Sequence, residues 1–251
     1  MGALHAGHLS LVQASLAESD VTIVTIFVNP TQFAPGEDLA KYPRTLEDDV
    51  EKLNRLGNVT VFAPSHAEMY PETATTTVVP PAIAKKLEGE FRPTHFAGVA
   101  TIVLKLLNAT QADKAYFGQK DFQQVQVVKQ MVRDLHVPTT IEVCPIARDA
   151  DGLALSSRNA FLSPEEREIA LSLSKTLDLV ETQILSGQTD GFEVITEMRQ
   201  ALIDGGVDNI DYAIVADPQT LETSDPIKRP VVALIAAHVG TTRLIDNRLI
   251  E

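Results

Sequence analysis

The chain has 251 residues, 44% of them hydrophobic and 22% charged, a balance typical of one large or two modest globular domains. Its 34 acidic and 21 basic residues give a formal net charge of -13, which argues against a surface that binds nucleic acid or an anionic membrane. The single cysteine permits no internal disulfide, so we expect a reducing compartment and a cytoplasmic protein. No run approaches the ~18 apolar residues of a membrane span, so no membrane partner is expected.

Two histidines precede the first apolar segment of the chain. His5 and His8 are three residues apart, Gly7 stands directly before the second, and an apolar run begins at Leu9. If that run is a helix, the N–H groups of its first turn and its dipole favour an anion there, and both imidazoles can donate hydrogen bonds to phosphate. The motif therefore suits a nucleoside triphosphate. Taken alone, it leaves a metal-binding pair or ordinary helix-start residues open.

The rest of the first half alternates between strands and helices. Residues 21–28 form a β-branched run that predicts a strand buried on both faces and ending at Asn29-Pro30. The patterns that follow predict a helix from an N-cap at Thr45 to about Leu56, a strand at 59–62, a helix at 96–109, a strand at 114–117, a helix at 122–135 and a strand at 140–143. This alternation is typical of a parallel α/β domain.

The pattern changes near Pro145. Ser163, Pro164 and Glu166 form a strong helix start, and the helix should run to about Leu185. A second helix at 192–203 precedes three strand-like runs at 210–215, 231–237 and 242–245. We therefore expect a parallel α/β domain over residues 1–147 and a small α+β domain with an antiparallel sheet over residues 148–251.

Two polar segments are candidates for phosphate binding. Gly118, Gln119, Lys120 and Asp121 lie where a predicted strand ends, at the sheet edge where ligands bind in α/β folds. There Lys120 can reach a phosphate and Asp121 can accept bonds from ribose hydroxyls, although a solvated turn is equally open. In the second half, the hydroxyls and guanidinium of 156–158 can wrap phosphate oxygens, with a capped surface loop as the alternative.

Further residues are candidates for a second substrate or a metal. Asn29 and Gln32 follow the first strand, and Gln32 with Gln124 can hydrogen-bond a polar, uncharged group, or can be plain polar residues. The segment from Arg92 to His95 can hold a carboxylate.

An acidic pair opens the predicted helix that follows Thr45. Asp48 or Asp49 can bind Mg²⁺ through oxygen, although compensation of the helix dipole is the better explanation for at least one of them.

Seven segments occur together in a fixed order. They are 1–8 (MGALHAGH), 26–33 (IFVNPTQF), 42–46 (YPRTL), 92–99 (RPTHFAGV), 117–124 (FGQKDFQQ), 151–159 (DGLALSSRN) and 243–247 (RLIDN). In these segments the chain strongly resembles the pantothenate synthetase (pantoate–β-alanine ligase) family, almost from end to end. The resemblance implies a Rossmann-like nucleotidyltransferase domain with a small C-terminal lid, a homodimer, and ATP-dependent joining of pantoate to β-alanine through a pantoyl-adenylate.

The resemblance also implies roles for individual residues. His5, His8 and Lys120 match catalytic positions, and His8 matches the position usually described as the proton donor. The implied ATP-binding residues are Met1, Gly2, Ala3, Leu4, His5, Ala6, Gly7, His8, Gly118, Gln119, Lys120, Asp121, Ala147, Leu155, Ser156, Ser157 and Arg158. Gln32 and Gln124 match the pantoate-binding pair, with Asn29, Arg92 and His95 as further candidates for pantoate or β-alanine. Asp48 matches a magnesium site.

The position of the first motif sets one further expectation. A phosphate-binding turn normally follows a strand, and family members carry a strand and a helix before Met1. We therefore expect an N-terminally short chain that binds ATP but turns over slowly. Two other readings remain: a related nucleotidyltransferase with a phosphorylated acceptor, which Gln32 and Gln124 argue against, and an inactive module that only binds its ligands.

Overall fold

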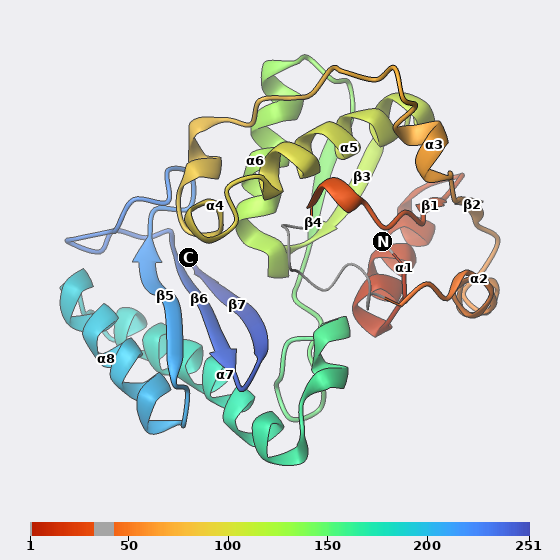
Figure 1. Cartoon of the computed structure of the whole chain (residues 1–251). Coiled ribbons are helices and arrows are strands. Elements are labelled where there is room, and N and C mark those ends of the chain that lie inside the picture. Colours follow the sequence, from red (N-terminus) through yellow and green to blue (C-terminus); the bar gives the residue numbers. More distant parts are fainter. Residues whose placement is uncertain (1, 33–42) are drawn as a thin grey trace. The chain divides into compact units, whose positions relative to one another are not determined.

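The computed structural model describes residues 2–32 and 43–251, and the chain divides into two compact units, Met1–Pro145 and Ile146–Glu251 (Figure 1). Three residues of the quoted motifs, Met1, Phe33 and Tyr42, lie outside the described residues. In the described part of the chain, no helix combines the length and the apolar character needed to cross a membrane.

The N-terminal unit contains, in chain order, α1 (Ala6–Glu18), β1 (Ile23–Thr25), η1 (Pro30–Gln32), α2 (Leu46–Asn54), β2 (Thr60–Phe62), α3 (His66–Met69), η3 (Ala82–Lys85), α4 (Glu88–Phe91), α5 (His95–Thr110), β3 (Lys114–Gly118), η4 (Gln119–Asp121), α6 (Phe122–Asp134) and β4 (Thr140–Cys144). The C-terminal unit contains η5 (Ser157–Phe161), α7 (Pro164–Leu185), α8 (Gly191–Asp204), β5 (Asn209–Ala216), β6 (Val231–Val239) and β7 (Thr242–Ile250).

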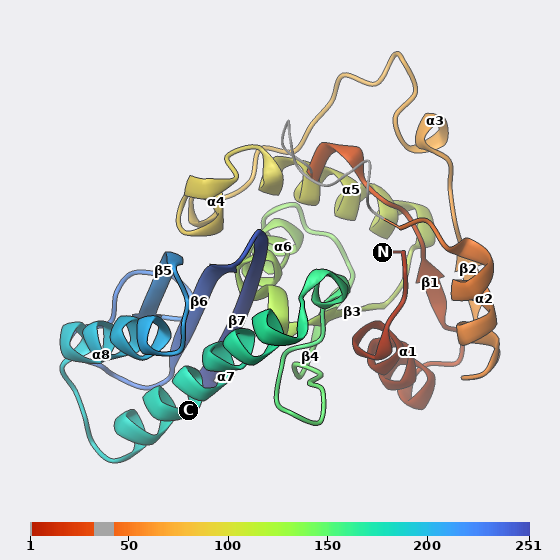
Figure 2. The ribbon, with the colours of Figure 1, turned by 60° about the horizontal axis from the view of Figure 1, so that its bottom comes forward.

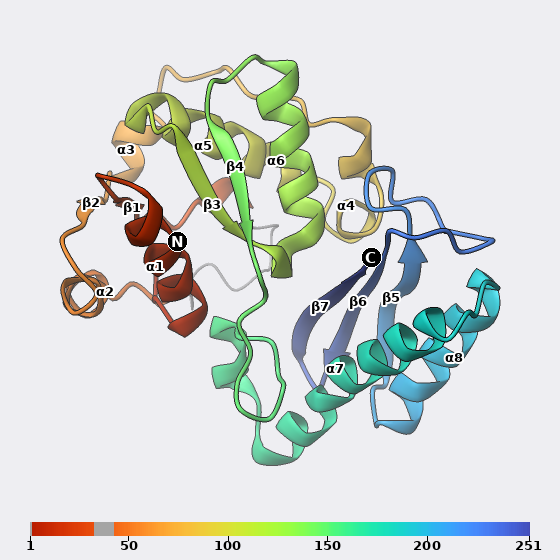
Figure 3. The same ribbon diagram turned by 180° about the vertical axis from the view of Figure 1, so that it is seen from behind.

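The N-terminal unit is parallel α/β, as expected, but its strands form two separate pairs. Strand β1 pairs with β2, and β3 pairs with β4, which lie side by side in Figure 3. Among the described residues no ladder joins the two pairs. Helix α1 lies beside β3, where Glu18 forms an ion pair with Lys114 at 2.7 Å.

The expectation that residues 21–28 are buried on both faces is wrong. Thr22, Val24 and Ile26 are buried, whereas the alternate side chains are more open: Val21 is 69% exposed, Ile23 is 37% exposed and Thr25 is half-buried. The reason is that the apolar cluster of this pair comes from α1 and α2, which cover one face only. A run of β-branched residues therefore overstates the burial of a strand that has one covered face.

Helices α5 and α6 pack against β3 and β4. Their shared cluster includes Val99 from α5 and Val127 and Met131 from α6, with Phe117 of β3 and Ile141 of β4 packed against it. Because η4 and α6 follow β3 directly, the first turn of α6 lies at the carboxyl end of this parallel pair. That is the edge where ligands bind in open α/β sheets.

The C-terminal unit is the expected α+β domain. Strands β5, β6 and β7 form an antiparallel sheet in that order, and α7 and α8 cover one face of it (Figure 2). Helix α7 begins with a full capping box between Ser163 and Glu166, and its buried residues Leu173, Leu177 and Val180 recur at helical spacing.

Candidate active site

The paired histidines cap α1. His5 is the N-cap residue, and its Nδ1 accepts the N–H of Gly7 at 3.2 Å, while Nδ1 of His8 accepts the backbone N–H of His5 at 3.4 Å. The two ring centroids are 3.9 Å apart. An imidazole whose Nδ1 accepts a hydrogen bond carries a proton on Nε2. The Nε2–H groups are therefore the donors that this cap can offer to an anion.

His8 is uncharged at neutral pH. Burial lowers the pKa of His8 to about 3, and the neighbouring charges of His5 and Lys120 act in the same direction. Lys120 thus lies within electrostatic reach of His8, whose pKa it helps to lower, although it is more than 100 positions later in the chain. The structure therefore places the His5 and His8 rings in contact, with Lys120 within electrostatic reach of His8.

A buried carboxylate on α2 holds the segment before the histidines. Ala3 has a left-handed backbone with φ of 51°, a conformation that is strained for alanine. Oxygens of Asp49 accept the N–H groups of Ala3 at 2.9 Å and Leu4 at 2.7 Å, and Lys52 donates to the carbonyl of Leu4 at 2.8 Å. Asp49 is fully buried. Helix α2 therefore fixes the path of the chain into His5.

The segment from Gly118 to Asp121 lies at the end of β3, as predicted. Gly118 is the last residue of the strand and the other three form η4. A Cβ added at Gly118 would meet no atom within 4 Å, so open space lies beside this backbone. A ligand can therefore approach the peptide closely here.

Asn29 is engaged in holding the end of β1. It is buried, its amide nitrogen donates to the carbonyl of Gly98 at 3.2 Å, and its amide oxygen accepts bonds from Thr31 and from Tyr70, both at 2.9 Å. A Cβ on Gly98 would lie 2.3 Å from the carbonyl oxygen of Thr31, so η1 sits directly on α5 only because residue 98 is glycine. These contacts fix the position of Gln32.

Arg92 and His95 converge on Gln32 through its backbone. The carbonyl oxygen of Gln32 accepts bonds from Arg92 at 3.1 Å and from Nδ1 of His95 at 2.9 Å. Burial and the charge of Arg92 lower the pKa of His95, while the bond to Gln32 and the charges of Glu88 and Asp121 oppose that shift. His95 is thus also within electrostatic reach of the η4 segment.

The carboxamides of Gln32 and Gln124 are half-buried on η1 and on α6. Neither forms a hydrogen bond to another side chain or backbone group that the structure describes, so each can serve a ligand.

The two adjacent acids of α2 have different surroundings. Asp48 is exposed in the first turn of the helix, whereas the oxygens of Asp49 are occupied by backbone N–H groups. Within the described ranges, no group of three or more His, Cys, Asp or Glu side chains is arranged to hold a metal ion. Asp48 is therefore able to contribute one carboxylate, but the described residues do not complete a metal cage.

The remaining candidates lie in the C-terminal unit, at the base of a short hairpin and just beyond it. The carbonyl of Ala147 accepts the N–H of Leu155 at 2.9 Å. Ser156 is the N-cap of η5, and its hydroxyl accepts the N–H of Arg158 at 3.2 Å; Ser157 is the first residue of η5. All five residues from 155 to 159 are half-buried.

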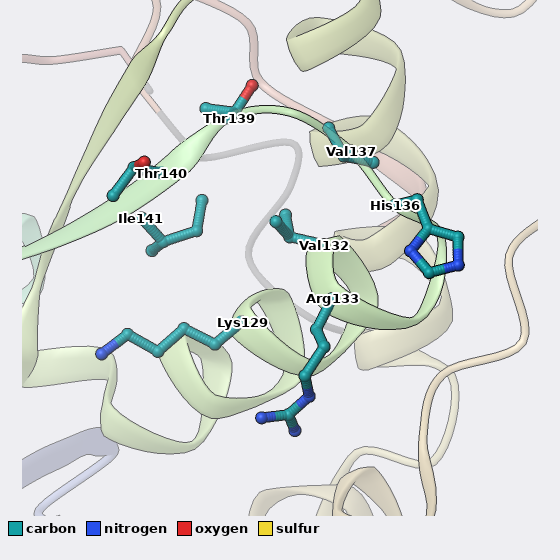
Figure 4. A pocket seen from close by; sticks show the side chains of 8 residues that line it. All are labelled: Lys129, Val132, Arg133, His136, Val137, Thr139, Thr140 and Ile141. Atoms are coloured by element: carbon teal, nitrogen blue, oxygen red, sulfur yellow. The ribbon is translucent and has the colours of Figure 1, made fainter.

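The N-terminal unit also has a surface hollow of about 510 Å³ (Figure 4). It is lined by residues from the C-terminal part of α6, the turn that follows and the start of β4, among them Lys129, Arg133, His136 and Ile141. The Gly118–Asp121 segment lies at the opposite end of α6, roughly 20 Å away for a helix of this length. The hollow is therefore not part of the candidate site.

Sequence reasoning missed the residues that position the site. Three sets of contacts are visible only in three dimensions: those of buried Asp49 and of Lys52 with the Ala3–Leu4 backbone, the Asn29–Tyr70 contact, and the ion pair of Arg148 with Asp246. The signal available in the sequence was weak: these residues lie inside or beside the quoted motifs, but many other polar residues do too.

Comparisons with known proteins agree on one family. A family model described as pantoate-beta-alanine ligase matches residues 1–249. The pantothenate synthetase of Rhodopirellula baltica is 50% identical over 99% of this chain and 88% of its own length, and that of Thermotoga petrophila is 47% identical over 100% and 89%.

Solved structures agree as well. The pantothenate synthetase of Thermus thermophilus superposes with a TM-score of 0.95 at 41% identity, over 99% of this chain and 90% of that one. The pantoate-beta-alanine ligase of Francisella tularensis, solved in complex with "Beta-gamma ATP" and β-alanine, gives a TM-score of 0.81 at 38% identity over 99% and 87%. With its motifs, fold and full-length similarity in agreement, this chain belongs to the pantoate–β-alanine ligase (pantothenate synthetase) family.

Proposed function

We propose that this chain joins pantoate to β-alanine at the expense of ATP, releasing pantothenate, AMP and pyrophosphate as in vitamin B5 and coenzyme A biosynthesis. The observation that carries this proposal is the pair of imidazoles that cap the N-terminus of α1, with His8 neutral and within electrostatic reach of Lys120, in a chain of this family. The Francisella relative, solved with an ATP ligand and β-alanine, supports the same substrates.

The chemistry explains why ATP is needed. A carboxylate and an amine do not condense at neutral pH, because hydroxide is a poor leaving group. A carboxylate oxygen of pantoate attacks the α-phosphorus of ATP, the bond to the β-phosphate breaks and pyrophosphate leaves. The neutral amine of β-alanine then attacks the carbonyl of the pantoyl-adenylate, AMP leaves with the bridging oxygen, and the amine loses a proton to give the amide.

His5 and His8 act in this proposal as hydrogen-bond donors. Their Nε2–H groups and the N–H groups of the first turn of α1 bind phosphate oxygens, and these bonds strengthen as charge develops on the attacked phosphorus. Because burial keeps His8 neutral, it donates a hydrogen bond without carrying a positive charge of its own. Lys120 supplies the counter-charge that lets two anions approach each other.

The other candidates are assigned as follows. We propose that Gln32 and Gln124 bind the hydroxyl groups of pantoate, with Asn29 holding Gln32 in place. The Arg92 guanidinium has five N–H donors, so it can serve a carboxylate while it and His95 support the Gln32 backbone.

ATP is proposed to contact further backbone and side chains in each unit. In the N-terminal unit these are 1–8 and Gly118–Asp121. In the C-terminal unit they are Ala147, near the adenine, and Leu155–Arg158, whose hydroxyls and guanidinium suit phosphate oxygens.

The donor set suits Mg²⁺ that arrives with ATP. Mg²⁺ commonly keeps several waters and binds one or two carboxylates together with substrate phosphates. A single exposed carboxylate at Asp48 fits that mode, and the ion would supply further counter-charge to the phosphates.

We also propose a cytoplasmic homodimer. The single cysteine supports the compartment and the family resemblance supports the dimer. Light scattering of the purified chain tests the second point, since a mass near 27.3 kDa would contradict it.

A stoichiometric assay tests the proposed function. Purified chain is incubated with ATP and Mg²⁺, with pantoate alone, with β-alanine alone and with both. We expect AMP and pantothenate in equal, catalytic amounts only with both substrates. ADP in place of AMP, or no pantothenate, would overturn the proposal.

A further inference from the structure

The hairpin that leads into Leu155–Arg158 is tied to β7 by a buried ion pair. Nη1 and Nη2 of Arg148 donate to Oδ2 and Oδ1 of Asp246 at 2.7 and 2.9 Å, a two-bond arrangement that fixes both position and orientation. The side chain of Asp246 is only 3% exposed and that of Arg148 is 22% exposed. The two residues are 98 positions apart, and Asp246 belongs to the RLIDN motif, to which the proposed reaction gives no role.

The same guanidinium also braces the hairpin from within. Nη1 of Arg148 donates to the carbonyl of Gly152 at 3.0 Å, across the turn. Gly152 has φ of 93°, so the turn needs glycine there. Backbone bonds between Asp149 and Leu153 and between Leu155 and Ala147 close the hairpin. One arginine therefore joins β7, the turn and the two hairpin arms into one rigid piece.

The hairpin delivers the chain directly into the proposed phosphate-binding loop. Leu155 is the last residue with a hairpin bond and the first of Leu155–Arg158. The amide of Asn159 donates back to the carbonyl of Ala154 at 3.0 Å, and η5 contacts β7. Strand β7 thus supports this loop on both sides.

We infer that Arg148 and Asp246 are positioning residues that set the place of Leu155–Arg158 for ATP. The inference rests on the proposed function of that loop. It adds that ATP recognition depends on a buried pair that does not itself touch the nucleotide. Replacing Asp246 by a neutral residue would leave the guanidinium of Arg148 without its charged partner.

The chain supplies a matched control on the same hairpin. Arg167 of α7 pairs with Asp149 and Asp151 at 2.7 Å, and all three side chains are about one-third exposed. Exposed pairs of this kind contribute little, because water and salt screen them. Removing the exposed Arg167 pairs should therefore leave Leu155–Arg158 in place, whereas removing the Arg148–Asp246 pair should not.

The experiment compares Asp246→Asn with Arg167→Gln. For Asp246→Asn we expect the KM for ATP to rise roughly tenfold or more, with the KM for pantoate and β-alanine changed by about twofold or less, since misplaced binding groups are costly. We also expect faster hydrogen exchange at the amides of Asp149, Gly152 and Leu155, with α8 unchanged. Arg167→Gln should match the parent chain in both measurements.

A double variant separates positioning from stability. Arg148→Met with Asp246→Leu replaces the pair by apolar side chains, a change that is often neutral for stability. We expect near-parental Tm but a raised KM for ATP and fast hairpin exchange. A parental KM for ATP and parental exchange in this folded variant would overturn the inference. If the parent chain makes no pantothenate, the proposed function fails, while the exchange comparison still tests the anchor.

Discussion

At the scale of single residues, the two imidazoles show how a cap can become a binding group. The Nδ1 atoms stabilise α1, and the same bonds direct the protons to Nε2. The structural role and the proposed catalytic role thus fall on different nitrogens of one ring, so substitutions can test them separately.

The His8→Asn variant should keep the helix cap and lose the proposed Nε2–H donor. The Asn oxygen can take the place of Nδ1 and accept the His5 N–H, but no group replaces the Nε2–H. We expect kcat to fall roughly 10²–10³-fold, as for loss of one preorganised donor, with little change in Tm.

His8→Ala is the comparison variant. Alanine supplies neither the acceptor for the His5 N–H nor a donor in place of Nε2–H, so kcat should fall as in His8→Asn and stability should fall as well, by about 0.5–2 kcal/mol. Steady-state kinetics and thermal unfolding of both variants check this; a His8→Asn variant within about threefold of parental kcat would contradict it.

The lowered pKa of His8 predicts a dependence of stability on pH. Between its ordinary value of 6.5 and the folded value of about 3, the unfolded chain binds a proton that the folded chain does not. Folding is therefore weakened as pH falls through this window, by linkage. His8→Asn lacks this group, so its free energy of unfolding should fall less between pH 7 and pH 4. Urea titrations at several pH values measure the slopes, and parallel curves for the two proteins would contradict the account.

At the scale of elements, α2 and α5 hold the site from outside it. The buried Asp49 on α2 satisfies two N–H groups of a strained segment, whereas the adjacent Asp48 faces solvent. Asp49→Asn should lower the free energy of unfolding by about 2–3 kcal/mol, the value of charge-assisted bonds to a buried group. Asp48→Asn should change it by less than about 0.5 kcal/mol but raise the Mg²⁺ concentration that gives half-maximal rate. Denaturant titrations measure both free energies of unfolding. Equal losses in the two variants would contradict the role of Asp49 in holding the Ala3–Leu4 backbone.

Gly98 sets the contact between α5 and η1. A methyl group there would meet the Thr31 backbone, which cannot rotate away as a side chain can. Gly98→Ala should cost about 1–3 kcal/mol by overpacking. It should also raise the KM for pantoate roughly tenfold by displacing Gln32, and leave the KM for ATP unchanged. A raised KM for ATP with a parental KM for pantoate would contradict the assignment of Gln32.

At the scale of the whole molecule, the longer helices and the strands were predictable because local signals agree, whereas the short helices α3, η3 and α4 were not predicted. Ser163 and Pro164 start α7 where the capping pattern predicts, and the three last strands occur in the expected antiparallel sheet. The histidine motif and the Gly118–Asp121 turn were found because each lies at an element boundary. Contacts between distant residues left no such signal: Arg148 and Asp246 are 98 positions apart, and nothing local distinguishes buried Asp49 from exposed Asp48. The burial of the run at 21–28 was predicted wrongly. Its apolar composition shows that both faces could be buried, but the packing of α1 and α2 covers only one of them.

Transfer of a carboxylate oxygen tests the central claim most directly. Pantoate labelled with ¹⁸O in its carboxylate is turned over with ATP, Mg²⁺ and β-alanine, and the AMP is analysed by mass spectrometry. Attack of the carboxylate on the α-phosphorus predicts one ¹⁸O in each AMP and one retained in the amide of pantothenate. Unlabelled AMP alongside labelled pantothenate would show that the carboxylate was not adenylated, and would contradict this account.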